Sequence, residues 1–232
     1  MGYAFSFTCR RLAKLSGMTS SLIMADLDGT LVDRDAAFSR SVARFCEHHG
    51  LGSEVVPWVM DLDEGGYAPR DRVAYAICVR FPELRPSDCW SLLDDGGCED
   101  VELADDVAAA LDSLRADGCR IVVVTNGPTS MQERKMFRIG LDRFVDGWVV
   151  SGTEGVKKPE PEIFRIAAKR VGSTLDGAWM IGDNPEADIR GAHVLGCRSS
   201  WISRGRTWPH EDFAPTRVDT DVASALLGVR AM

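Results

Sequence analysis

The stretch SLIMADLDGTLVD at residues 21–33 constrains the fold of this chain more than any other. In it, the apolar run of residues 22–25 ends in two carboxylates one residue apart, Asp26 and Asp28. The run is too short for a helix and a Gly-Thr break follows it, so it predicts a buried strand. In an open α/β sheet, ligands bind in the crevice beyond the carboxyl ends of the strands. The two carboxylates are therefore expected to lie in a binding crevice.

The spacing of Asp26 and Asp28 suits them to different tasks. If the chain stays extended, their side chains share one face, and Gly29 lets the backbone turn immediately afterwards. One carboxylate can bind a divalent cation and attack as a nucleophile, while the other, in a different environment, transfers a proton. The alternative is structural: the two aspartates form a turn after a buried strand, and Thr30 and Asp33 act as caps.

The size and charge of the chain limit its classes of partner. With 232 residues it can form one large domain or a core domain with a smaller insertion. Its net charge of -8 repels nucleic acids and anionic membranes, so neither is expected as a partner. A divalent metal and a few local cations can still hold a small phosphate in an acidic protein.

Cysteine usage and hydropathy indicate the compartment. The seven cysteines form no C-x-x-C pair, which argues against a zinc site or a disulfide framework and indicates buried thiols in a reducing compartment. No apolar run approaches the roughly 18 residues of a membrane span. We therefore expect a soluble, cytoplasmic protein. Residues 1–17 lack the apolar segment of a signal peptide, and we interpret them as a dispensable extension rather than an amphipathic arm or a targeting remnant.

A helical region is expected after the first strand. Apolar side chains recur at helical spacing from Asp35, and Gly50 closes this segment. Shorter helices are expected at residues 54–61, 71–81 and 86–93. Paired glycines and a proline predict a loop at residues 62–69. Residues 35–98 are thus predicted to be an all-helical insertion, the alternative being helices that pack on one side of the sheet.

The rest of the chain alternates between strand and helix patterns. Further strands are expected within residues 120–127, at 148–151, from Ala178, and at 197–202. Helices are expected at residues 105–117, 128–140, 161–171 and 222–227. Ser130 and Glu133 are spaced as a capping box, and residues 203–220 are rich in loop signals. This alternation predicts an α/β fold, a doubly wound parallel sheet of five core strands that is Rossmann-like.

Polar residues follow the later strands as they follow the first. Thr125 and Asn126 end the second strand, and Asp183 ends the fourth. If the first and fourth strands are neighbours, Asp183 lies beside Asp26 and both offer hard oxygen ligands to a magnesium ion. Asp188 follows five residues later, where it could instead complement the dipole of a helix N-terminus.

Together these segments resemble the four motifs of the haloacid dehalogenase-like superfamily, most of whose members are magnesium-dependent phosphohydrolases. Residues 26–33 match Asp-x-Asp-Gly-Thr-Leu-x-Asp, Thr125 matches the second motif, Lys158 before Pro159 the third, and residues 182–188 match Gly-Asp-x-x-x-x-Asp. The resemblance spans residues 21–202. It implies the strand order 5-4-1-2-3, a hydrolase core at residues 18–34 and 99–232, and a small helical cap domain at residues 35–98.

The resemblance also implies roles for these residues. Asp26 would be the nucleophile that forms an aspartyl-phosphate, and Asp28 the general acid and base. Mg²⁺ would be held by the Asp26 carboxylate, the Asp28 backbone carbonyl and Asp183. The substrate phosphate would contact Thr125, Asn126 and Lys158, and Asp188 would lie behind the site as an acceptor for the lysine or a water-mediated metal partner. Lys157 is expected to be solvated.

The substrate class implied is a small phosphorylated metabolite, bound by a monomer or a homodimer. Related dehalogenases lack the second aspartate and use no metal, so Asp28 favours phosphoryl transfer. A phosphomutase of the same superfamily and a non-catalytic binding or regulatory protein remain the alternatives. The Gly65-Gly66-Tyr67 loop is our candidate specificity element. Six arginines could bind a carboxylate or a second phosphate, namely Arg34, Arg40, Arg70, Arg72, Arg80 and Arg85.

Overall fold

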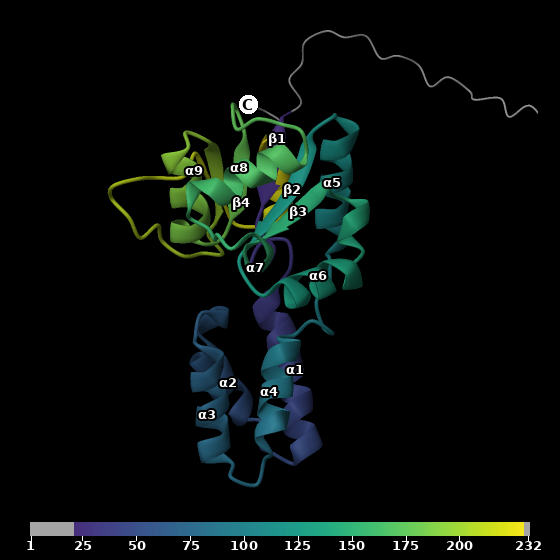
Figure 1. The fold of residues 1–232 in the computed structure, drawn as a ribbon, viewed down its shortest axis with the longest axis vertical. Coiled ribbons are helices and arrows are strands. Elements are labelled where there is room, and N and C mark those ends of the chain that lie inside the picture. Colours follow the sequence, from purple (N-terminus) through teal and green to yellow (C-terminus); the bar gives the residue numbers. More distant parts are fainter. Residues whose placement is uncertain (1–20, 230–232) are drawn as a thin grey trace, which may run out of the picture.

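The computed structural model describes residues 21–229, and the predicted extension at residues 1–17 lies outside them. A six-stranded parallel sheet in the order β3-β2-β1-β4-β5-β6 lies among helices in one half of the molecule, the upper half in Figure 1. The strands are β1 Leu22–Ala25, β2 Arg120–Thr125, β3 Gly147–Val150, β4 Trp179–Gly182, β5 Arg198–Ile202 and β6 Arg217–Asp219. The α/β, doubly wound class predicted from the sequence is confirmed.

The strand count is corrected from five to six. The first five strands follow the expected order, and β6 adds to β5 at the edge, inside the segment predicted to be loop. This strand has only three residues, and its central Val218 is 56% exposed. An edge strand that is not covered on both faces carries no continuous apolar run, so the sequence pattern gave no signal for it.

Strand β1 lies in the middle of the sheet because its side chains are buried on both faces. Ala25 is aligned with Val123 of β2 and with Ile181 of β4. Alternate residues of β1 enter two separate apolar layers, and Met24 faces the layer opposite to Ala25. One layer is covered by α5 Asp105–Ala116 and α10 Val222–Gly228, and the other by α8 Pro161–Arg170.

Four helices form a separate helical unit with its own apolar core at one end of the sheet (Figure 1). They are α1 Arg34–His49, α2 Val55–Asp63, α3 Arg70–Arg80 and α4 Pro86–Asp95. The segment predicted as a loop at residues 62–69 is partly helical, since α2 runs to Asp63 and a 3₁₀ turn, η1, covers Glu64–Gly66. The buried ion pair between Asp63 and Arg34 holds the end of α2 against α1.

The helix that follows β2, α6 Thr129–Arg138, begins differently from the prediction. Its N-cap is Pro128, with no capping hydrogen bond from a side chain, so the predicted capping box of Ser130 and Glu133 is wrong. Glu133 instead accepts a hydrogen bond from the indole of Trp148 on β3, at 3.3 Å. A contact with a neighbouring strand thus replaces the local one.

The remaining short elements are η2 Leu141–Arg143, α7 Ser151–Glu154, the π-helix η3 Pro185–Arg190, and α9 Gly191–Val194. Within residues 21–229, the six cysteines are free. The same part of the chain contains no helix with the length and apolarity required to traverse a bilayer.

Candidate active site

The loop after β1 brings two carboxylates to the end of the sheet. The backbone N–H of Asp26 still donates to Ile181 on β4, at 2.9 Å, and the chain then turns back so that Asp28 pairs with Val32. Gly29 has φ +78°, and a Cβ there would lie 2.8 Å from the carboxylate of Asp183. The turn therefore needs glycine both for its backbone conformation and for the close approach of Asp183, the residue after β4.

The structure clarifies the alternative reading of this loop. Asp33 is the N-cap of α1, where its carboxylate accepts from the N–H of Ala36 at 3.0 Å. Thr30 caps no helix, and its hydroxyl is buried without a hydrogen-bond partner. Capping thus accounts for Asp33 and leaves the two aspartates before it unexplained.

Lys158 is the buried cation of the site. Its ammonium lies 2.6 Å from Oδ1 of Asp26 and 2.7 Å from Oδ1 of Asp188, and its side chain is 2% exposed. Asp188 is fully buried, and its other oxygen accepts from the N–H of Asn184 at 3.0 Å. Lys157 is exposed, as expected.

Asn126 fixes the backbone of this lysine. Its Oδ1 accepts from the N–H of Lys158 at 2.9 Å, and its Nδ2 donates to the carbonyl of the same residue at 3.0 Å. The side chain that we predicted as a phosphate ligand thus joins the end of β2 to the loop before α8. Its role toward phosphate stays a prediction.

The electrostatics of the site are governed by burial. Burial raises the pKa of Asp26 to about 7, although the Lys158 ammonium lowers it. Burial and the charge of Asp26 raise the pKa of Asp183 to about 6, against the opposing effect of Arg206. Burial opposes the charge of Lys158, but the two adjoining carboxylates outweigh it and raise its pKa. Burial therefore makes the charged forms of Asp26 and Asp183 costly.

The donor set suits a divalent cation. One carboxylate oxygen from each of Asp26, Asp183 and Asp188 lies within 4.8 Å of the others. Oxygen ligands at such spacing match the preference of hard cations such as Mg²⁺. Asp188 is already engaged by Lys158 and by a backbone N–H, so Asp26 and Asp183 are the two carboxylates left to face an ion.

Two residues of the site were missed by sequence reasoning. Lys135 on α6 places its ammonium 2.7 Å from both oxygens of Asp28. Gln132, one turn earlier, donates through Nε2 to Oδ2 of Asp28 at 3.0 Å and to the hydroxyl of Thr125 at 2.6 Å. Both side chains lie on the buried face of α6, beside Met131 and Met136. A lysine and a glutamine at apolar positions of a helix were the signal in the sequence.

A cavity of about 390 Å³ lies between the helical unit and the sheet. The predicted site residues line it from the sheet, and the helical unit contributes Arg34, Arg70 and Tyr67. Tyr67 accepts a hydrogen bond from Nδ2 of Asn184, the residue after Asp183. The other four arginines proposed for substrate binding do not line this cavity, and each has another contact: Arg40 with the Asp100 carbonyl, Arg72 with Glu64, Arg80 with Trp58, and Arg85 with Asp88.

The model of the haloacid dehalogenase-like hydrolase family matches residues 21–196. Among individual relatives, the phosphoserine phosphatase of Thermus thermophilus is 37% identical over 97 residues, which are 42% of this chain and 39% of the relative. The ribulose-1,5-bisphosphate 5-phosphatase of Halopiger xanaduensis is 35% identical over 141 residues, 58% of this chain and 59% of that enzyme. These matches span about two fifths to three fifths of each relative's length.

Solved structures are similar over most of the chain. A magnesium-bound HAD-hydrolase from Bacillus subtilis has a TM-score of 0.68 and 19% identity, covering 90% of this chain and 99% of that one. The 2-haloacid dehalogenase of Pseudomonas syringae has a TM-score of 0.61 and 21% identity, covering 92% and 99%. At these identities the likeness shows a common fold, which hydrolases of different substrates share.

Proposed function

This chain belongs to the haloacid dehalogenase-like hydrolases, and on that basis we propose that it is a magnesium-dependent phosphatase that hydrolyses a small phosphomonoester through an aspartyl-phosphate. One observation carries the proposal. Asp26 lies beside both a buried ammonium, at 2.6 Å, and a second strand-end carboxylate that can share a cation with it. A nucleophilic carboxylate, a fixed cation and a metal position are what attack on a phosphate dianion requires.

In the first step, an oxygen of Asp26 attacks phosphorus and the bond to the ester oxygen breaks. Asp28 gives its proton to that leaving oxygen, and Lys158 and Thr125 contact the phosphoryl oxygens as negative charge shifts among them. In the second step, Asp28 takes a proton from water, whose oxygen attacks phosphorus. The bond from phosphorus to Asp26 breaks, and inorganic phosphate and a free carboxylate result.

Mg²⁺ is the cofactor that fits this site. Asp26, Asp183 and the backbone carbonyl of Asp28 would hold it, and it would supply positive charge that balances the carboxylates and the incoming phosphate. Asp188 would act through Lys158, because its ion pair with the ammonium keeps Lys158 directed toward Asp26.

Residues 35–98, which include all of the helical unit except Arg34, are proposed to be a cap over a hydrolase core of residues 18–34 and 99–232. The cavity at its junction with the sheet is lined from both sides, which suits a cap that selects the ester and keeps water from the reacting atoms. The names of the relatives, which include phosphatases of phosphoserine and of a sugar bisphosphate, support a small phosphorylated metabolite as substrate.

Two alternatives remain in the same site. A phosphomutase would return the phosphoryl group to a retained sugar phosphate, a choice set by contacts with the cap. A non-catalytic binding protein would keep the fold without turnover. The second carboxylate, Asp28, favours phosphoryl transfer over dehalogenation, because a proton must be moved to and from oxygen.

The test is phosphate release from p-nitrophenyl phosphate. We expect a burst and steady turnover that need Mg²⁺, and loss of both in Asp26→Asn, whose amide cannot form the intermediate. Mass spectrometry of the quenched enzyme should show one added phosphoryl group in the wild-type chain and none in the variant. Turnover that persists in Asp26→Asn would refute the proposal. A screen of phosphorylated metabolites would then identify the substrate.

A further inference from the structure

Gln132 and Lys135 occupy a buried face of α6 and contact two residues of the proposed mechanism without having a part in it. Each is 1% exposed. Gln132 contacts Asp28 and Thr125, and Lys135 contacts both oxygens of Asp28. Burying an ammonium and an amide costs free energy unless both are fully bonded, so their place at this site calls for a specific task.

The hydrogen bonds of Gln132 have a defined direction. A carboxylate can only accept, so the group of Gln132 that lies 3.0 Å from Oδ2 of Asp28 must be its NH₂. The same NH₂ lies 2.6 Å from the hydroxyl oxygen of Thr125, which therefore accepts from it. The hydroxyl hydrogen of Thr125 then has to be donated elsewhere, and the open direction is the cavity that Thr125 lines. A phosphoryl oxygen there would receive it.

The two oxygens of Asp28 are bonded unequally. Oδ2 accepts from both Lys135 and Gln132, whereas Oδ1 accepts from Lys135 alone. Since each carboxylate oxygen has about two lone pairs, Oδ2 is saturated and Oδ1 keeps one free. Oδ1 is thus the atom of Asp28 that can exchange a proton with substrate or water.

We propose that Gln132 and Lys135 are positioning residues for phosphoryl transfer. Gln132 turns the hydroxyl of Thr125 into a donor toward the phosphoryl group, and the two side chains together select Oδ1 of Asp28 as the proton-transferring oxygen. The inference rests on the proposed phosphatase function. It adds two long-range contacts to it, across 104 residues for Gln132 and 107 for Lys135.

Gln132→Glu tests the direction at Thr125 without turnover. The new carboxylate is nearly isosteric but accepts from Thr125, so the hydroxyl no longer donates to phosphate. We expect the Mg²⁺-loaded variant to bind inorganic phosphate about tenfold more weakly than the wild-type chain by calorimetry. Gln132→Met removes the contacts without reversing them, so it should weaken phosphate binding less than Gln132→Glu does. Equal phosphate affinity in Gln132→Glu and wild type would overturn the assignment.

Lys135→Met tests the choice of oxygen on Asp28. p-Nitrophenolate leaves without a proton, whereas glycerol phosphate needs one, and kcat/KM reports the step in which the ester bond breaks. We expect kcat/KM to fall about 100-fold for glycerol phosphate and by less than about threefold for p-nitrophenyl phosphate. Lys135→Arg should recover part of the kcat/KM that Lys135→Met loses for glycerol phosphate. Equal losses on both esters would mean a merely structural role and would refute the proposal.

Controls separate this inference from the function it depends on. Lys169→Met, at an exposed position of α8, removes the same charge and should leave both esters unaffected. A wild-type chain without turnover would refute the phosphatase function, and the phosphate-binding comparison would still decide the role of Gln132. If Lys135→Met does not give a cooperative thermal transition, Gln132→Glu assayed on the two esters decides instead, and an unchanged ester preference there counts against the proposal.

Discussion

The ammonium of Lys158 lies between two buried carboxylates and compensates only part of their charge. Asp26 is 7% exposed and Asp188 is fully buried, while Asp183 stands close to both. Breaking such a cluster by removing its cation would leave uncompensated buried charge, which costs about 3–5 kcal/mol. Protons or a divalent cation can supply the positive charge that Lys158 alone does not provide.

The first prediction follows from the sign of the pKa shifts. The folded pKa values of about 7 for Asp26 and about 6 for Asp183 lie above the usual 3.8, so the folded chain binds more protons than the unfolded chain between these values. The stability contributed by these protons is present at low pH and is lost as the pH rises through about 6 to 7. A bound cation replaces them. We expect Mg²⁺ to raise Tm more at about pH 8 than at about pH 5.

The measurement is thermal unfolding with EDTA or with Mg²⁺ at the two pH values. Asp26→Asn is the control, because it removes one of the two titrating groups and should reduce the difference. An Mg²⁺-induced rise in Tm that is the same at both pH values would contradict the prediction.

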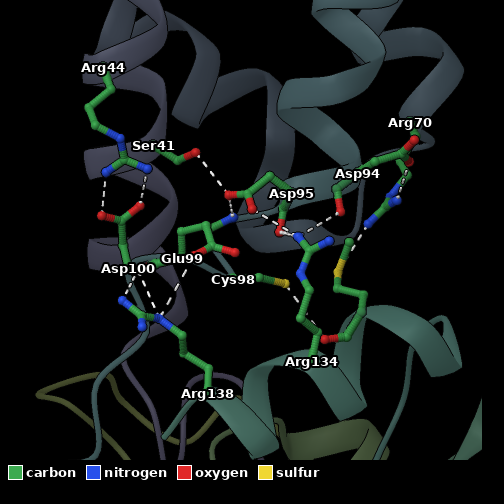
Figure 2. Close-up of polar contacts among 12 residues, drawn as sticks. Ser41, Arg44, Arg70, Asp94, Asp95, Cys98, Glu99, Asp100, Arg134 and Arg138 are labelled. Atoms are coloured by element: carbon green, nitrogen blue, oxygen red, sulfur yellow. Dashed lines mark hydrogen bonds and ion pairs between the residues drawn. The ribbon is translucent and has the colours of Figure 1, made fainter.

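At the scale of elements, α6 links the active site to the segment that returns from the helical unit. Gln132 and Lys135 of α6 contact Asp28, and Arg134 and Arg138 of the same helix reach Asp95 and Glu99 (Figure 2). Arg134 donates to Oδ1 and to the carbonyl of Asp95, at 2.8 and 3.2 Å, and Arg138 donates to the carbonyl of Glu99 at 3.1 Å. These contacts are partly exposed, so each contributes little by itself.

Gly97 is the tightest point of this return segment. Its φ is +80°, and a Cβ there would lie 2.7 Å from the backbone nitrogen of Phe38 on α1. The backbone of the return segment therefore packs directly on α1. Any residue other than glycine at position 97 would require the return segment or α1 to move. The helical unit is held at its base by this contact as well as by the arginines.

The second prediction concerns this contact. Gly97→Ala should lower stability by about 1–3 kcal/mol more than Gly118→Ala. Gly118 has nearly the same backbone strain, with φ +84°, but a Cβ there meets nothing within 4 Å. Urea unfolding of the two variants separates the clash from the strain. Equal losses in the free energy of unfolding would show that the return segment can move away from α1.

At the scale of the whole molecule, the cavity exists only because the helical unit and the sheet meet. Tyr67, 71% exposed, crosses this boundary with its hydrogen bond from Asn184. Asn184 also caps the π-helix η3 through the N–H groups of Glu186 and Ala187, so it is a fixed partner. Through Tyr67, the Gly65-Gly66-Tyr67 loop thus contacts Asn184, which follows the proposed metal ligand Asp183 in the sequence.

The third prediction tests this loop as a specificity element. Tyr67→Ala should change kcat/KM among phosphorylated metabolites by about tenfold and change p-nitrophenyl phosphate hydrolysis less, because the small generic ester needs few contacts with the cap. Tyr75→Ala is a matched control, since Tyr75 is also 71% exposed but does not line the cavity. Equal losses for all esters in Tyr67→Ala would reject the assignment.

The sequence by itself determined the fold class and which polar residues end the buried strands. The five core strands and the helices of residues 34–95 were recognisable from the sequence. Burial of a strand on both faces gives a continuous apolar run, and burial of a helix along one stripe gives apolar residues at helical spacing. The sequence also pointed to Asp26, Lys158 and Asp183 as one candidate site, and the fold brings these three together.

Only the tertiary structure decided what surrounds them. Lys135 and Gln132 meet Asp28 across more than a hundred residues, Tyr67 reaches Asn184 from another unit, and β6 joins the sheet at an uncovered edge. None of these leaves a periodic signal, because periodicity records which face of an element is buried and not what it is buried against. The partner of a buried polar side chain is set by the packing of distant segments, and packing is decided when the whole chain folds.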